Sequence, residues 1–123
     1  MARRRAERRE RPRAPQSEYR DEAAGAVLVL RGALTPATRA SYARIASGED
    51  LVAAANREDA WHRAFEFLFE RLAVSWTIAG APPITRQAEL LARLRVASAQ
   101  ERTWLRERLR EHCAQWFPDV NAP

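Results

Sequence analysis

The feature that most constrains the fold is the apolar segment at residues 60–79, which stops at Gly80 and is followed by Pro82 and Pro83. At the 100° step of an α-helix, its large side chains gather on two sides. A helix that is apolar on two sides is usually buried between neighbours, so we expect a core helix here. The main arc contains Trp61, Phe65, Leu68, Phe69, Leu72 and Trp76, and the second, narrower stripe contains Phe67, Val74 and Ile78.

The second stripe has two interpretations. Core packing is the simpler one, because large apolar side chains supply most of the burial in a small domain. A chain of 123 residues can also lack the surface needed to cover both sides of one helix. Phe67, Val74 and Ile78 are therefore also candidates for an interface with a second copy or with a partner helix.

Helix boundaries are marked along the rest of the chain. N-capping side chains satisfy the free N–H groups at the start of a helix, while glycine or proline marks its end. Ser98 and Glu101 form a capping box at the start of a helix that Pro118 ends. The other expected starts and stops are Thr35 with Pro36, Gly48, Asn56, Gly80 and Thr85.

One segment is ambiguous between strand and helix. Residues 25–32 place five apolar residues between two glycines, and periodicity cannot decide between the two structures. A strand would lack partners, because no second run of this kind exists in the chain, so a helix or an extended packing segment is favoured. We therefore predict an all-α fold, a compact bundle of four to five short helices, with residues 17–123 as a single helical domain.

The formal charge lies entirely in the first 16 residues. This segment holds seven arginines and two glutamates, a net charge of +5, whereas the other 107 residues hold 14 arginines and 14 acidic residues. A like-charged segment with few apolar residues cannot offset its ordering entropy, so residues 1–16 are expected to be a disordered arm. Arginine replaces lysine throughout, which is typical of a GC-rich genome. The arm's candidates for contact with an acidic partner are Arg3, Arg4, Arg5, Arg8 and Arg9.

The expected last helix carries a tryptophan away from its apolar face. Leu105, Leu109 and Cys113 share one face, whereas Trp104 projects on the opposite, polar side. Exposed aromatic residues mark interfaces, which makes Trp104, with Arg108 and Glu111 beside it, the first candidate contact surface. The alternative is that Trp104 folds over a neighbouring loop near Tyr19.

Nucleic-acid binding is the second interpretation of the chain. Residues 86–110 loosely resemble a DNA-reading helix-turn-helix, with an arginine-rich second helix. Leu91 and Arg95 depart from this pattern, because a small residue and a glycine are usual at those two positions. The stripe of Arg102, Arg106 and Arg110 would contact phosphates, together with the arm.

Catalytic and metal chemistry find little support in the sequence. His112 and Cys113 are adjacent on a helix and point about 100° apart, so they do not form a nucleophile–base pair. One cysteine and two histidines give no recognisable metal site, and no glycine-rich phosphate loop is present. We predict no enzyme, no cofactor and no small-molecule substrate. No secretory signal or membrane-spanning run is found, so the cytoplasm is the expected location.

The sequence thus predicts a small helical protein that binds another protein or itself in an assembly or adaptor role. The basic arm would add electrostatic attraction to an acidic partner. The alternative is a DNA- or RNA-binding protein that uses residues 86–110 and the arm.

Overall fold

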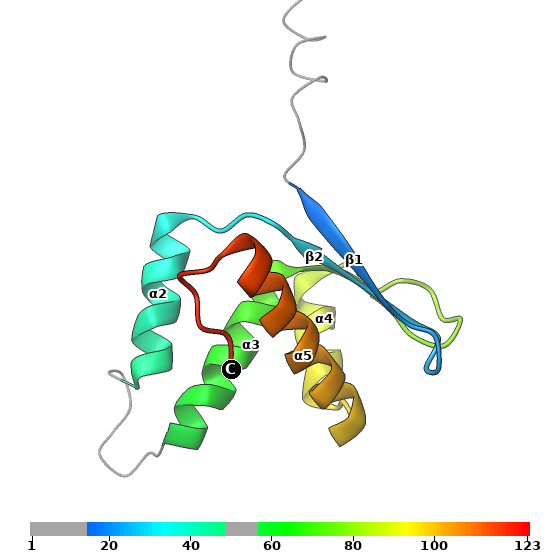
Figure 1. Ribbon diagram of the computed structural model, residues 1–123. Coiled ribbons are helices and arrows are strands. Elements are labelled where there is room, and N and C mark those ends of the chain that lie inside the picture. The colour runs from blue at the N-terminus through cyan, green and yellow to red at the C-terminus, as the bar shows by residue number, and fades with distance from the viewer. Residues whose placement is uncertain (1–14, 49–56) are drawn as a thin grey trace, which may run out of the picture.

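The computed structural model describes residues 15–48 and 57–123 and contains a three-stranded antiparallel sheet in addition to helices (Figure 1). The prediction of an all-α bundle is therefore wrong, and the described part of the chain is a mixed α/β structure. In chain order the elements are β1 (Gln16–Asp21), β2 (Ala26–Arg31), α2 (Pro36–Ser47), α3 (Arg57–Leu72), β3 (Ala73–Thr77), α4 (Gln87–Arg95) and α5 (Ala99–Trp116).

The ambiguous segment at residues 25–32 is the central strand of this sheet. It forms β2, which lies between β1 and β3 in the strand order β1-β2-β3. Leu28 is paired with Tyr19 of β1 and with Trp76 of β3. Its two partner strands were not predicted. Strand β1 is a polar segment near the N-terminus, and β3 is formed by the last part of the apolar segment that was predicted as one core helix.

The apolar segment at residues 60–79 does not form one helix. Helix α3 ends at Leu72, and the chain continues directly as strand β3, so the predicted second stripe does not exist as a helical face. Trp76 is buried as expected, at 1% exposure, but it lies on a strand. Trp61 is 53% exposed, although the helical pattern had placed it with the core.

Several helix boundaries agree with the capping pattern. The Thr35 hydroxyl accepts a hydrogen bond from the Thr38 N–H, and Gly48 ends α2 in the left-handed conformation. Ser98 and Glu101 form the complete capping box of α5. Thr85 is not a cap, because α4 begins after Arg86, and Gly80 lies in a turn after β3 instead of ending a helix. The expected cap Asn56 lies outside the described residues.

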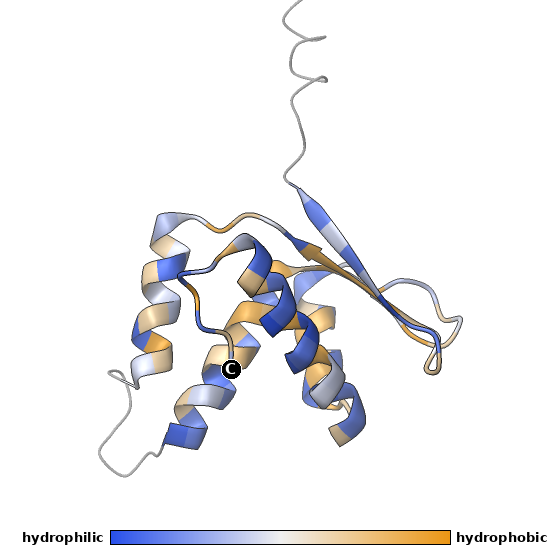
Figure 2. Cartoon of the chain, in the orientation of Figure 1, coloured by the Kyte–Doolittle hydropathy of each residue, from blue (hydrophilic) through white to orange (hydrophobic). Residues whose placement is uncertain are grey.

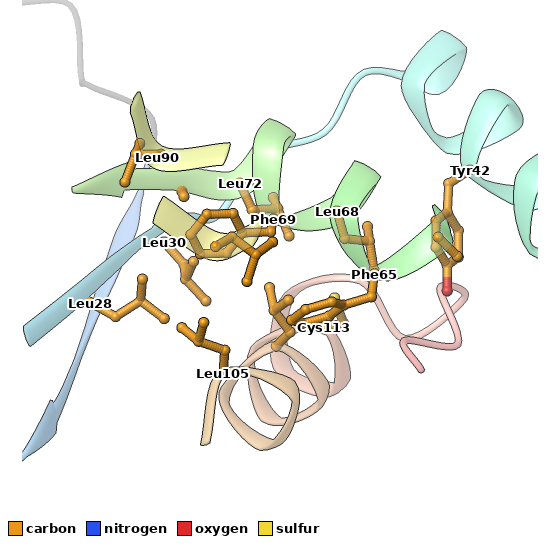
Figure 3. Close-up of a cluster of buried hydrophobic side chains, with 14 of the residues drawn as sticks. Leu28, Leu30, Tyr42, Phe65, Leu68, Phe69, Leu72, Leu90, Leu105 and Cys113 are labelled. Atoms are coloured by element: carbon orange, nitrogen blue, oxygen red, sulfur yellow. The ribbon is translucent and has the colours of Figure 1, made fainter. Parts of the chain in front are cut away.

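The core forms between one face of the sheet and the helices. Figure 1 shows α3, α4 and α5 on the same side of the sheet, with α2 packed beside α3. In Figure 3, Leu28 and Leu30 of β2 point into the same cluster as Phe69 of α3 and Leu105 of α5. The fully buried large side chains are Trp76, Phe65, Phe69, Phe117, Leu28, Leu30, Leu68, Leu72, Leu90, Leu94, Leu105 and Leu109.

The two strands of the β1–β2 hairpin differ in polarity. Strand β2 is apolar over most of its length, whereas β1 is mostly polar (Figure 2). Successive side chains of a strand point to opposite faces. Tyr19 therefore faces the helices, as its partner Leu28 does, while Glu18 and Arg20 lie on the opposite face and are exposed.

The strand assignment of β2 predicts an alternation in the effect of mutations. Leu28→Ala should lower the free energy of unfolding by about 2–5 kcal/mol, because it leaves a cavity in the core. Val29→Ala on the opposite, half-buried face should cost about 1 kcal/mol. Urea denaturation of both variants measures the difference, and equal losses at the two positions would contradict the strand.

Candidate functional site

The main candidate site is a groove between the β1–β2 hairpin and the N-terminal half of α5. It has a volume of about 700 Å³. Three separate stretches of the chain form it: the hairpin, the end of β3 with the residue that follows, and the exposed side of α5. We call it the hairpin–α5 groove, and its lining residues are Asp21, Ala23, Ala24, Ala26, Trp76, Ile78, Ala99, Gln100, Glu101, Thr103, Trp104 and Glu107.

Trp76 is the most buried side chain of the groove lining. Its ring makes a T-shaped contact with Phe69, with 5.8 Å between centroids, and the guanidinium of Arg93 lies 5.0 Å from its centroid. The indole Nε1 of Trp76 is buried and has no hydrogen-bond partner among the described residues. A buried N–H without an acceptor is costly, so this atom is an unused donor in the free protein.

Trp104 contributes the partly exposed aromatic surface of the groove. Its ring packs on the edge of the core and has the guanidinium of Arg108 5.9 Å from its centroid. Ile78, a residue of the predicted second stripe, lines the same groove from the end of β3. The structure therefore brings together two candidate interface residues that the sequence had placed on different helices.

The rim of the groove is acidic. Asp21, Glu101 and Glu107 belong to its lining, which contains no arginine, and Arg108 Nη2 lies 3.7 Å from a carboxylate oxygen of Glu107. Glu101 accepts a 2.6 Å hydrogen bond from Arg93 Nη2 and another from the Ser98 N–H. Burial acts to raise the pKa of Glu101, but the hydrogen bonds from Ser98 and Arg93 outweigh burial and lower it, so this carboxylate stays ionised at neutral pH.

The remaining candidate interface residues lie outside the groove lining. Phe67 is half-buried on α3, with the guanidinium of Arg71 5.2 Å from its ring centroid. Val74 is half-buried on β3. On α5, Arg108 lies one turn beyond Trp104, and its Nε is 3.4 Å from a carboxylate oxygen of Glu111.

The three arginines of the α5 stripe make contacts within the chain. Arg102 Nη2 donates a hydrogen bond to the Arg95 carbonyl, and Arg110 Nε donates to the carbonyl of Pro123, both at 3.0 Å. The guanidinium of Arg106 lies 5.4 Å from the ring centroid of Phe65. Phosphate binding by this stripe would have to replace or share these contacts.

The two helices of the predicted helix-turn-helix correspond to α4 and α5, which are separated by residues 96–98. The other proposed anion contacts, Arg3, Arg4, Arg5, Arg8 and Arg9, lie outside the described residues. Nucleic-acid binding stays a prediction.

His112 and Cys113 are both buried, and His112 holds the sheet to α5. The Arg31 carbonyl can only accept, so His112 Nε2 carries the proton of their 2.8 Å hydrogen bond. The neutral ring then accepts at Nδ1 from the Tyr19 hydroxyl, at 2.9 Å. Burial raises the pKa of the Cys113 thiol to about 11, so this thiol is protonated at neutral pH.

Sequence reasoning missed most of the groove. Asp21, Ala23 and Ala24 belong to a hairpin that was not predicted, and they carry no distinctive pattern of their own. The signal that was available was Trp104, a large aromatic residue on a polar helix face. Within residues 15–48 and 57–123, no group of three or more histidine, cysteine, aspartate or glutamate residues could hold a metal ion, and no helix there is long and apolar enough to cross a membrane.

Comparisons with protein-family models, with curated proteins and with solved structures found no significant match to this chain. The function of the hairpin–α5 groove therefore has to be inferred from its own residues.

The environment of His112 predicts a loss of stability in weak acid. Burial lowers the pKa of His112 below its usual 6.5, so the unfolded chain takes up this proton before the folded protein does. The free energy of unfolding should be highest above about pH 6.5 and should fall below that pH, by up to about 1.4 kcal/mol per pH unit. His112→Gln should reduce this slope in urea denaturation between about pH 6.5 and pH 5, where few carboxylates titrate.

The matched control is His62→Gln. His62 is the other histidine of the chain and its side chain is 44% exposed on α3, so the pair of variants compares a buried with an exposed histidine. A wild-type slope that His112→Gln does not alter would contradict the assignment.

Proposed function

We propose that this chain is a non-enzymatic protein-interaction protein with an assembly or adaptor role, and that the hairpin–α5 groove binds a segment of a partner protein. The partner segment would combine a large apolar side chain with arginine or lysine residues on either side. The cytoplasmic location predicted from the sequence belongs to this proposal.

The proposal rests on one observation: the groove combines an apolar surface with acidic residues in its lining. Trp104 and Ile78 are partly exposed in the groove, and a tryptophan in a concave surface is a frequent anchor of protein interfaces. A volume of about 700 Å³ accommodates several side chains of a bound segment.

Charge complementarity selects the class of partner. The lining holds three carboxylates and no arginine, although Arg93 lies 2.6 Å from Glu101 and Arg108 lies 3.7 Å from Glu107 at its border. Acidic rims favour cationic segments and repel acidic ones, an effect that salt screens.

The proposal differs from the expectation that the arm binds an acidic partner. That expectation concerns residues outside the described ranges and stays a prediction. The first 14 residues are themselves strongly basic, but they contain no aromatic residue and no leucine, isoleucine or valine. Their positive charge is therefore complementary to the acidic groove, but they have none of these apolar side chains to pack on its apolar surface.

Fluorescence anisotropy with labelled synthetic peptides tests the proposal. The test peptide has a central leucine–phenylalanine pair with two arginines on each side. A second peptide replaces the arginines with glutamates, a third replaces the apolar pair with serines, and a fourth has the sequence of residues 1–14. The first should bind most tightly, with an affinity that falls as salt rises.

The variant Trp104→Ala should weaken binding of the first peptide by about tenfold or more, because it removes the aromatic anchor. Trp61→Ala is the matched control, since Trp61 is 53% exposed and lies outside the groove. Equal binding of the arginine and glutamate peptides would contradict the proposal. Equal effects of the two tryptophan variants would also contradict it.

A further inference from the structure

Within the described residues, the outer edge of the sheet at β1 has backbone groups that pair with no other strand. In residues 15–48 and 57–123, strand β1 pairs with β2 on one side only, as the first strand in the order β1-β2-β3. Sheet edges of this kind are templates for pairing with another chain. On the opposite edge, residues of β3 already bond outward, because Trp76 exchanges backbone hydrogen bonds with Ile84.

The hydrogen-bond pattern shows which residues of β1 face outward. In an antiparallel pair, alternate residues direct both backbone groups toward the partner strand. The Gly32 N–H donates to the Pro15 carbonyl, so Pro15 and every second residue after it face β2. Gln16, Glu18 and Arg20 therefore direct their N–H and C=O groups away from β2, toward the free edge.

The side chains at these outward positions are exposed and opposite in charge. The Glu18 and Arg20 side chains are 50% and 63% exposed, and they form a 3.2 Å ion pair along the strand. A single exposed pair of this kind contributes little to stability, so its energetic role within one chain is small. The pair does give the edge a self-complementary pattern of charge.

We propose that two copies of this chain associate through their β1 edges in antiparallel register, with Glu18 of each copy opposite Arg20 of the other. The two β1 strands then join two three-stranded sheets into one continuous sheet. The two-fold axis passes between the two copies of Tyr19. This inference is independent of the hairpin–α5 groove and of its proposed partner.

Charge selects this register among the symmetric ones. Outward-facing residues must pair with outward-facing residues for the ladder to form. A register centred on position 18 puts two glutamates opposite each other, and one centred on position 20 does the same with two arginines. Directly opposite like charges destabilise a strand pair, whereas the register centred on Tyr19 makes two Glu18–Arg20 pairs.

Helix α5 lies close to the same edge and carries a second pair of opposite charges. The Tyr19 hydroxyl donates to His112 and the Trp116 indole N–H donates to the Ser17 hydroxyl, both at 2.9 Å, which places α5 beside β1. Arg108 and Glu111 lie 3.4 Å apart.

Sedimentation equilibrium over a wide concentration range tests the dimer, against a monomer mass of 14.0 kDa. The wild type should approach twice this mass as concentration rises. Glu18→Arg should shift the dimer dissociation constant upward by tenfold or more, because it places a second arginine opposite Arg20. Arg20→Glu should have the same effect with two opposed glutamates. Glu58→Arg on the exposed start of α3 is the matched charge-reversal control and should not alter it.

A mixture of the two variants gives the decisive result. In a heterodimer of Glu18→Arg with Arg20→Glu, every position 18 meets an opposite charge at position 20, so the mixed sample should regain the wild-type affinity. The ion pair within each strand stays broken in that mixture, so restored association cannot come from it. Circular dichroism should show that both variants remain folded.

Three results would overturn the proposal. One is a wild type that stays monomeric at all concentrations. The second is a dimer that neither charge reversal weakens, and the third is a mixture that associates no better than each variant alone.

Discussion

The central strand β2 is the element on which the rest of this structure depends. It pairs with β1 on one side and β3 on the other, and its inward residues Ala26, Leu28 and Leu30 are buried. Both outer strands obtain their sheet hydrogen bonds from β2. Without β2, β1 has no strand to pair with, and nothing favours a strand over a continued helix at residues 73–77. Helix α5 packs Leu105 and Leu109 into the core that β2 begins, and His112 of α5 bonds the Arg31 carbonyl at its end.

The same arrangement produces both surfaces to which we assign interactions. The β1–β2 hairpin brings Asp21, Ala23 and Ala24 opposite Trp104, and this forms the hairpin–α5 groove. On the outer side of the hairpin, the β1 edge pairs with no other described strand and carries Glu18 and Arg20. One surface has a partly apolar lining and an acidic rim, and the other is a row of backbone groups with balanced charge. They therefore suit different partners: a basic segment with an apolar anchor, and a second copy of the chain.

The sequence predicted the helices best where capping side chains mark them. Thr35, Gly48, Ser98 and Glu101 act locally, and their effect does not depend on distant residues. The strands were missed because their partners lie far away along the chain. Strand β1 showed no apolar alternation, since its inward side chains include Ser17 and Asp21 together with Tyr19.

The boundary between α3 and β3 was missed for a different reason. Leu72 and Trp76 are both buried and four residues apart, a spacing that fits one helical face as well as it fits a helix followed by a strand. Trp104 was chosen as a candidate from the sequence because a tryptophan is unusual on a polar helix face. Its neighbours across the groove could not be identified, because they come from the unpredicted hairpin.

The most direct test of this account is an NMR titration of the ¹⁵N-labelled protein with the arginine-flanked apolar peptide. It would be followed on the indole N–H signals of the four tryptophans. Trp76 and Trp104 line the groove, so their signals should shift and saturate together. Trp61 lies outside the groove, and the Trp116 indole N–H already donates to the Ser17 hydroxyl, so neither signal should move. Shifts at Trp61 or Trp116 without shifts at Trp76 and Trp104 would contradict the account, as would no shift at all.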